Sequence, residues 1–255
     1  MPPSSLASAS EINTKGTLYG IGVGPGDPEL LTVKAVRILS QAKIIAYAAP
    51  LANDGAGGIT SASMARAIAS RYFPPDIIEY PIHLPMVVDR APAQQIYQQA
   101  AMDFRQFLQK GEDVVVLCQG DPMFYGSFMY LLPHVQPDFK VEIVPGVSSL
   151  MAASAGLIMP LVERNQTLSV VPGPSDNEIL RQIIAVTDTT AILKIGRHFP
   201  RIRALLSDMG LLDQSYYIER ASQIGEKYSR LADISDECSY TAPYFAMILV
   251  KKPMV

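Results

Sequence analysis

The sequence predicts an α/β protein built from two α/β domains. Short apolar runs alternate with segments of helical period along the chain. In the first half most of these runs are separated by a helical segment, the pattern of parallel strands joined by crossover helices. With 255 residues the chain is long enough for one large domain or two smaller ones.

The first half reads as strands and helices in alternation. Apolar residues at Leu31, Ala35 and Ile38 give residues 29–41 a helical period. Residues 113–118 contain Val-Val-Val-Leu and predict a buried strand. Further strands are predicted over residues 17–23, 43–47, 77–80 and 140–144, and further helices over residues 60–70, 93–110 and 125–132.

The second half predicts a second sheet. Its expected strands are residues 166–171, 190–195, 215–221 and 244–250, and its expected helices are residues 176–185 and 200–207. We place the boundary near Asp138, before the segment VEIVPG. The expected division is a flexible Ser- and Ala-rich tail over residues 1–15, an N-terminal α/β domain over residues 16–138 and a C-terminal α/β domain over residues 139–255. The tail lacks the basic start and apolar core of a signal peptide.

One uncharged stretch has the length of a membrane span. It runs for 20 residues from Ile143 to Val162, between Glu142 and Glu163. Its two prolines, two glycines and three serines favour a strand end, a turn and a buried helix instead. We therefore expect no membrane partner.

Composition excludes other classes. A formal net charge of −3 gives no basic footprint for nucleic-acid binding. His83, His134 and His198 are scattered without zinc-ligand spacing, so we expect no protein-bound metal. Cys118 and Cys238 form no C-x-x-C motif, which is typical of free thiols in the cytoplasm. We expect Cys118 to be a buried, inert thiol.

The segment YGIGVGPGDPELLT, residues 19–32, is rich in glycine like a phosphate-binding loop, but its glycine spacing does not match the phosphate-loop patterns. In the pattern G-x-G-x-x-G, Pro25 or Asp27 falls in the last glycine position, and no lysine follows for a G-x-x-x-x-G-K loop. An aspartate at the start of the following helix would also repel a pyrophosphate. A dinucleotide or nucleoside-triphosphate site is therefore disfavoured.

The same kind of turn recurs. Asp27 and Pro28 suit the N-cap and first position of a helix, which would by itself explain them. A second Gly-Asp-Pro, residues 120–122, follows the buried strand, and a third turn carries Ser148 and Ser149, which suit helix capping or ligand binding. Turns at the carboxyl ends of strands in one sheet mark the usual ligand edge of an α/β fold.

Three segments together, GIGVGPGDPELLT, GDPMFYGSF and VPGVSSLMAASAG, resemble the tetrapyrrole methylase family in order and spacing. The resemblance runs from about Gly16 to Val250 and includes ILKIGRH and APYFAMILV. It implies two α/β domains with a cofactor cleft between them, usually in a homodimer. It also implies S-adenosyl-L-methionine as methyl donor and a small-molecule tetrapyrrole as substrate.

Within the family, these segments look most like members that methylate precorrin-2 at C20 in cobalamin synthesis. The alternatives are the cobalt-containing substrate of the anaerobic route and another ring position, such as C11 or C17. A non-catalytic nucleotide-binding module and a nucleic-acid methyltransferase of the same fold are disfavoured by the failed phosphate patterns and by the acidic balance.

The family's cofactor contacts carry over by position. They correspond to Pro25, Gly120, Asp121, Phe124, Ser148, Ser149, Ile195 and Ala242. Ser149 and Ile195 are departures, because relatives often have alanine and methionine there. Asp121 is expected to bond the ribose or amino-acid end of the cofactor, to cap a helix, or to do both. Phe124 and the segment around Ala242 suit the adenine.

The substrate's many carboxylates suit arginine and lysine side chains. Lys194, Arg197 and His198 follow a predicted strand and are the expected substrate-binding set; a solvated surface turn is the alternative. Weaker candidates are Arg66, Arg90 and Arg164.

Methyl transfer from a sulfonium needs alignment more than a catalytic triad. Loss of the C20 proton afterwards calls for a base. The candidates are Asp27, Tyr80 and His83, each of which also has a structural explanation, so the catalytic residue is left open.

Overall fold

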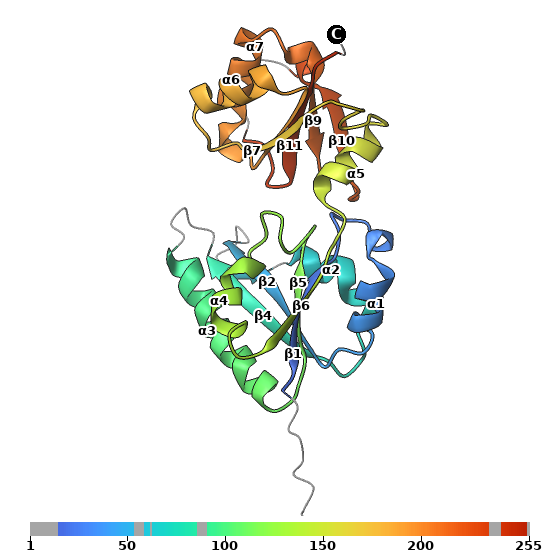
Figure 1. Ribbon diagram of the computed structural model, residues 1–255, viewed down its shortest axis with the longest axis vertical. Helices are drawn as coiled ribbons and strands as arrows, with labels where there is room; N and C mark the ends of the chain where they lie inside the picture. Colours follow the sequence, from blue (N-terminus) through green and yellow to red (C-terminus); the bar gives the residue numbers. More distant parts are fainter. Residues whose placement is uncertain (1–14, 54–58, 62, 86–90, 235–240, 254–255) are drawn as a thin grey trace, which may run out of the picture. The chain divides into compact units, whose positions relative to one another are not determined.

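The computed structural model describes residues 15–53, 59–61, 63–85, 91–234 and 241–253. The chain forms two compact units (Figure 1). The first comprises Met1–Val23 and Thr32–Gly146, and the second Gly24–Leu31 and Val147–Val255. The predicted tail, except Lys15, lies outside the described residues.

The first unit is built on a six-stranded sheet. Its strands are β1 (Thr17–Gly22), β2 (Ile44–Asn53), β3 (Ile59–Ser61), β4 (Ile78–Pro85), β5 (Val114–Cys118) and β6 (Lys140–Val144). Five of them follow the order β3-β2-β5-β1-β6, and β4 also pairs with β2. Every pairing is parallel except that of β3 with β2, which confirms the predicted, largely parallel sheet.

Helices cover both faces of this sheet. They are α1 (Val33–Leu39), α2 (Met64–Ala69), α3 (Ala91–Gln109) and α4 (Leu132–Val135), with short 3-10 turns at Ser70–Tyr72 and Phe128–Tyr130. Figure 1 shows α1 and α2 on one face and α3 and α4 on the other.

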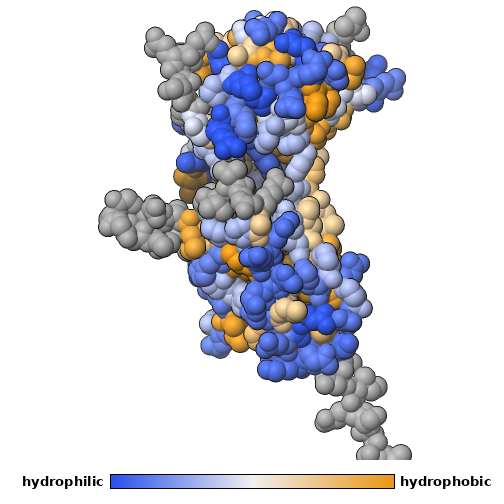
Figure 2. Space-filling model, turned by 90° about the vertical axis from the view of Figure 1, so that its left-hand side faces the viewer, coloured by the Kyte–Doolittle hydropathy of each residue, from blue (hydrophilic) through white to orange (hydrophobic). Residues whose placement is uncertain are grey.

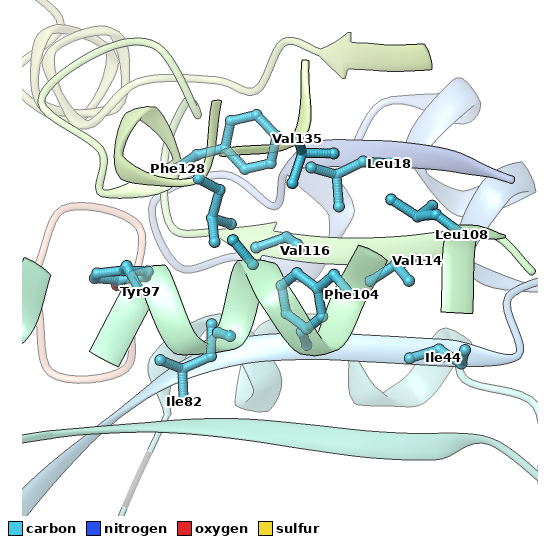
Figure 3. Packing of buried hydrophobic residues seen from close by; sticks show 14 of the residues in the cluster. Leu18, Ile44, Ile82, Tyr97, Phe104, Leu108, Val114, Val116, Phe128 and Val135 are labelled. Carbon is cyan, nitrogen blue, oxygen red and sulfur yellow. The ribbon is translucent and has the colours of Figure 1, made fainter. Parts of the chain in front are cut away.

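The core between α3 and the sheet explains why the predicted long helix forms. Its buried residues recur every three or four positions, so one stripe of the helix faces the strands. Phe104 and Leu108 lie against Ile44, Val114 and their neighbours (Figure 3). Full burial of each such side chain contributes about 1.5–3 kcal/mol, so this stripe anchors α3.

The second unit has a five-stranded sheet in the order β10-β9-β11-β8-β7. Its strands are β7 (Leu168–Pro172), β8 (Thr189–Leu193), β9 (Ser215–Glu219), β10 (Lys227–Arg230) and β11 (Ala246–Lys251). Its helices are α5 (Ser149–Gly156), α6 (Asn177–Val186) and α7 (Phe199–Asp208), with 3-10 turns at Pro28–Leu30, Gly196–His198, Leu212–Gln214 and Leu231–Asp233. Only β7 and β8 run parallel, and α6 and α7 share a core with the sheet.

The boundary differs from the one expected near Asp138. Strand β6 pairs with β1 along its whole length, with Thr17 opposite Lys140 and Ile21 opposite Val144. The first unit therefore continues to Gly146. A strand's own sequence does not reveal which sheet it joins, because pairing depends on contacts distant in the chain.

Two predicted helices begin later than expected, and a third is replaced by shorter pieces. Thr32 accepts a hydrogen bond from the N–H of Ala35 (3.1 Å), so α1 begins at Val33 after a separate 3-10 turn. Ser63 caps α2 in the same way, after strand β3. In the 125–132 segment the backbone of Tyr125 has a φ of 54°, which no helix accommodates.

The uncharged stretch from 143 to 162 folds as expected into a strand end, a turn and helix α5. Among the described residues, no helix is long and apolar enough to cross a membrane. On the side shown in Figure 2, hydrophilic residues predominate around separate hydrophobic patches.

Candidate functional site

Three loops leave one edge of the first sheet. Strands β5, β1 and β6 are parallel neighbours, with Gly22 opposite Cys118 and Ile21 opposite Val144. The chain after each strand therefore emerges at the same edge. These are the three turns that the sequence singled out, so the expected grouping of the first two at one sheet edge is confirmed.

Three glycines at this edge pack backbone against backbone. A Cβ on Gly146 would lie 2.1 Å from the carbonyl oxygen of Gly120, and one on Gly22 would lie 2.5 Å from the nitrogen of Gly146. Neither position admits a side chain. Gly120 has a φ of +69°, and a Cβ there would meet nothing within 4 Å. Its backbone thus borders open space.

Asp121 ties two of these loops together. Its Oδ1 accepts the N–H of Met123 at 2.8 Å, and its Oδ2 accepts the N–H of Gly146 at 3.0 Å. The first bond is the local turn expected of an aspartate before a proline. The second holds the end of the β6 loop. Because each carboxylate oxygen accepts more than one hydrogen bond, Asp121 keeps capacity for a ligand.

Phe124 lies half-buried in the same turn. Its ring meets the ring of Tyr125 edge to face, with centroids 5.1 Å apart. A Cβ on Gly126 would lie 2.6 Å from the carbonyl oxygen of Pro122, so the turn is tight. The structure thus places Gly120, Asp121 and Phe124 together in the first unit.

The first glycine-rich loop is divided between the units. Its strand belongs to the first unit, but Gly24–Leu31 belongs to the second. Asp27 accepts the N–H of Glu29 at 2.8 Å with Pro28 at the first helical position, which confirms the predicted cap. Pro25 therefore shares a unit with Ser148, Ser149, Ile195 and Ala242.

Ser148 occupies the N-cap position of α5 without making a cap hydrogen bond. Its Oγ is buried and has no hydrogen-bond partner among the described residues. A buried hydroxyl without a partner costs free energy, so this one is available to a ligand. Ser149 is the first residue of the helix.

Ala242 lies beside the residue that follows Ile195, because a backbone hydrogen bond joins Ala242 to Gly196. The N–H of Ala242 donates to the carbonyl oxygen of Gly196 at 3.1 Å. Both side chains are buried in the core of the second unit. Both residues are buried as a whole, with Ile195 at 0% and Ala242 at 3% exposure, backbone included.

Lys194, Arg197 and His198 follow the carboxyl end of β8, as predicted. Lys194 and Arg197 are exposed and His198 is half-buried. Burial, with the charges of Arg197 and Arg201, lowers the pKa of His198. The imidazole is thus mainly neutral at pH 7, and the positive charge of this set comes from the lysine and the arginine.

The three candidate bases have different settings within their units. Tyr80 donates from its hydroxyl to Oδ2 of Asp103 at 2.5 Å, and burial together with Asp103 raises its pKa to about 12. Tyr80 and His83 both lie on β4, three residues apart, so they point to opposite faces of the sheet. Asp27 belongs to the second unit.

Two of the further arginine candidates, Arg66 and Arg164, lie among the described residues. Arg66 donates from Nε and Nη2 to both oxygens of Glu79, at 2.5 and 2.7 Å, and is thus engaged in an ion pair. Arg164 is exposed, with a φ of 49°. Arg90 lies outside the described residues.

Sequence reasoning missed Ser222 and Gln223, which contact the first loop. They lie in the turn between β9 and β10, and because β10 was not among the predicted strands, this turn was not recognised. It also missed that Gly146 is held by Asp121.

Residues 17–234 match the family model described as Tetrapyrrole (Corrin/Porphyrin) Methylases. The chain belongs to this family. The matched residues include the three loops that carry the resemblance to this family, so the expected membership is confirmed.

This tetrapyrrole methylase has relatives with assigned activities. It is 37% identical over 243 residues to the precorrin-2 C(20)-methyltransferase of Sinorhizobium sp, covering 92% of this chain and 95% of that protein. It is 32% identical to the cobalt-precorrin-2 C(20)-methyltransferase of Salmonella typhimurium, covering 93% of this chain and 97% of that protein.

Among solved structures, the methylase resembles uroporphyrin-III C-methyl transferase from Thermus thermophilus complexed with S-adenyl homocysteine. The TM-score is 0.63 and the identity 24%, covering 92% of both chains. This likeness confirms the predicted fold of two α/β domains.

Proposed function

We propose that this tetrapyrrole methylase transfers a methyl group from S-adenosyl-L-methionine to C20 of precorrin-2, giving precorrin-3A in cobalamin biosynthesis. The observation that carries the proposal is the 37% identity to a precorrin-2 C(20)-methyltransferase over 92% of the chain. The match extends over nearly the whole of both proteins, so it includes both units.

The loops of the structure fit a methyl donor of this kind. The open space at Gly120 lets a ligand approach the backbone closely. The buried Oγ of Ser148 lacks a partner among the described residues, and Asp121 has spare acceptor capacity. We assign cofactor binding to Pro25, Gly120, Asp121, Phe124, Ser148, Ser149, Ile195 and Ala242.

When bound, S-adenosyl-L-methionine supplies a methyl group already activated on a positive sulfur. The protein's part is therefore to bind and align. Asp121 contributes a negative charge suited to the cofactor's cationic groups, and Ser148 a hydroxyl. The backbone of Gly120, which borders open space, provides a neutral donor and acceptor.

Substrate binding is assigned to Lys194, Arg197 and His198. The exposed charges of Lys194 and Arg197 suit the carboxylates on the rim of a tetrapyrrole. His198, mainly neutral at pH 7, would add a hydrogen bond instead of a charge. Of the candidate bases, Tyr80 is the least suited, because a phenol with a pKa of about 12 is almost fully protonated at pH 7 and so cannot accept the proton.

A second candidate substrate is the cobalt complex of precorrin-2. It is favoured by the 32% identity to the Salmonella typhimurium enzyme, which covers 93% of this chain. The residues that we assign to the substrate face its carboxylates and so do not separate the two forms.

One experiment tests both. Purified protein is incubated with methyl-labelled S-adenosyl-L-methionine and precorrin-2, with and without cobalt, and NMR locates the added methyl group. We expect the label at C20. Labelling at C11 or C17, or at no ring carbon in either form, would contradict the proposal.

We also infer a cytoplasmic homodimer. The cytoplasmic location is supported by two cysteines without a C-x-x-C motif, and the dimer by the family resemblance. Sedimentation equilibrium should give a mass twice that of the chain, and a monomer mass at micromolar concentration would contradict the dimer.

A further inference from the structure

The first glycine-rich loop rests on the turn between β9 and β10. The Nε2 of Gln223 donates to the carbonyl oxygen of Pro25 at 2.8 Å, across 198 positions of sequence. The N–H of Asp27 donates to the Oγ of Ser222 at 3.3 Å. Two consecutive residues of the turn thus hold two residues of the loop, one on each side of Gly26.

Gly26 is the point of closest approach. A Cβ there would lie 2.2 Å from the Cγ of Gln223 and 2.9 Å from the carbonyl oxygen of Ser222. The loop can lie on the turn only because residue 26 has no side chain. The fourth glycine of the motif therefore serves packing against a distant turn.

The supporting turn is itself braced. Ser222 has a φ of 62°, and its N–H donates to Oε2 of Glu226 at 2.8 Å. The hydroxyl of Tyr228 donates to the same oxygen at 2.9 Å. The N–H of Gln223 donates to the carbonyl oxygen of Arg220 at 2.8 Å. These bonds give Gln223 a defined place from which to reach Pro25.

We propose that Gln223 is a positioning residue for the cofactor: through its bond to Pro25 it sets where the Gly24–Asp27 segment lies on the second unit. The inference rests on the proposed function, in which Pro25 contacts S-adenosyl-L-methionine. Gln223 acts through the loop and is not among the residues that we assign to the cofactor. Its loss removes the bond donated to the Pro25 carbonyl and lets the segment move more, so the cofactor meets a less ordered surface.

The test replaces only the donor. Gln223→Met keeps the length of the side chain and its packing on Gly26 but cannot donate to Pro25. The matched control is Gln182→Met on α6, which removes an exposed glutamine bonded to Glu178 at 2.8 Å. Calorimetry measures the affinity for S-adenosylhomocysteine, hydrogen exchange measures protection of the Gly26 and Asp27 amides, and circular dichroism gives the Tm.

We expect Gln223→Met to weaken S-adenosylhomocysteine about fivefold to tenfold, the effect of one lost hydrogen bond. Exchange at Gly26 and Asp27 should become faster, and the Tm should stay near that of Gln182→Met. Unchanged exchange would overturn the proposal, because the bond would not hold the loop. Faster exchange with unchanged affinity would also overturn it, because the loop's position would not matter to the cofactor.

A double-mutant cycle adds a second, independent measurement. Gly26→Ala alone should push the loop off the turn and weaken S-adenosylhomocysteine, since the new Cβ meets the Cγ of Gln223. In a Gln223→Ala background that Cγ is gone, so the same substitution should cost less. Strictly additive effects would contradict the assigned contact.

The test of Gln223 can be distinguished from the test of the proposed function. S-adenosylhomocysteine binding does not depend on which ring carbon receives the methyl group. Wild-type protein that binds it but methylates a position other than C20 would remove the proposed substrate and leave the role of Gln223 standing. Wild-type protein that does not bind it would overturn both.

Discussion

Asp121 joins two loops of the first unit through its two carboxylate oxygens. One oxygen forms the local turn with Met123, and the other accepts the N–H of Gly146, 25 residues later. The sequence predicted a cap, a ligand contact or both. The structure adds a third task, because the β6 loop depends on this carboxylate for its position.

Asp121→Asn should therefore destabilise the protein by about 1–3 kcal/mol, because an amide group has only one oxygen for two backbone donors. It should also weaken S-adenosylhomocysteine. Urea unfolding and calorimetry measure the two effects. Asp176→Asn is the control, since Asp176 is an exposed N-cap without a side-chain cap bond. If both variants are equally stable, the bond to Gly146 contributes nothing.

Arg66 forms an ion pair with Glu79, which argues against its role in binding substrate carboxylates. As a bare arginine it was a candidate for substrate carboxylates, but it pairs with Glu79, which also accepts from the hydroxyl of Tyr47 at 2.6 Å. The guanidinium of Arg66 and then the Tyr47 hydroxyl hold the pKa of Glu79 at about 2, against the opposing effect of burial.

The pair predicts a pH dependence. Because the folded-state pKa is depressed, the stabilisation is present above about pH 4.5 and is lost as the pH falls toward 2. The side chains are 44% and 31% exposed, so Glu79→Gln should cost only about 0.5 kcal/mol at pH 7. The difference from wild type in urea unfolding should shrink at pH 3. A difference that stays constant with pH would contradict the ion pair.

At the scale of elements, the loops after β1, β5 and β6 depend on glycine for two different reasons. Gly22 and Gly146 admit no side chain because backbone atoms of neighbouring loops lie where a Cβ would be. Gly120 has room for a Cβ but has a positive φ. Parallel pairing of the strands brings the three loops to one edge, and the glycines let the loops pack closely there.

Gly120→Ala and Gly210→Ala form a matched pair. Their φ values are +69° and +68°, and neither new Cβ would meet anything within 4 Å. Each substitution should cost about 1–2 kcal/mol of stability from backbone strain alone. Only Gly120→Ala should weaken S-adenosylhomocysteine, measured by calorimetry. Equal affinities in the two variants would remove Gly120 from the cofactor site.

The apolar period predicted where helices and strands occur better than it predicted the residues at which they begin and end. Helix α3 and strand β6 lie where the sequence placed them, because a long apolar stripe and a short apolar run are local patterns. The break before α1 was missed, since a capping threonine interrupts a helix without interrupting the apolar period.

At the scale of the whole molecule, each unit has its own core. Cys118 belongs to the first core and is buried, which with the charge of Asp121 raises its pKa to about 12. Its thiol donates to the carbonyl oxygen of Val116, at 3.9 Å. The thiol is thus a reporter of opening in the first unit.

In a Cys238→Ser background at pH 8, Cys118 should react with a thiol reagent roughly a thousandfold more slowly than in urea-unfolded chain, because almost no thiolate is present. Reactivity should rise over the urea range in which the first unit unfolds, followed by circular dichroism. Rapid labelling of native protein would show that the thiol is not protected.

The sequence by itself determined the α/β class, the order of most elements, the family, and the grouping of the first two loops at one sheet edge. These follow from local patterns: apolar period, glycine spacing and Asp-Pro turns. Only the tertiary structure decided that β6 belongs to the first sheet, that Gly24–Leu31 belongs to the second unit, and that Tyr80 is tied to Asp103. Each of these rests on contacts between residues far apart in the chain, such as Gln223 and Pro25, whose meeting depends on how whole elements pack.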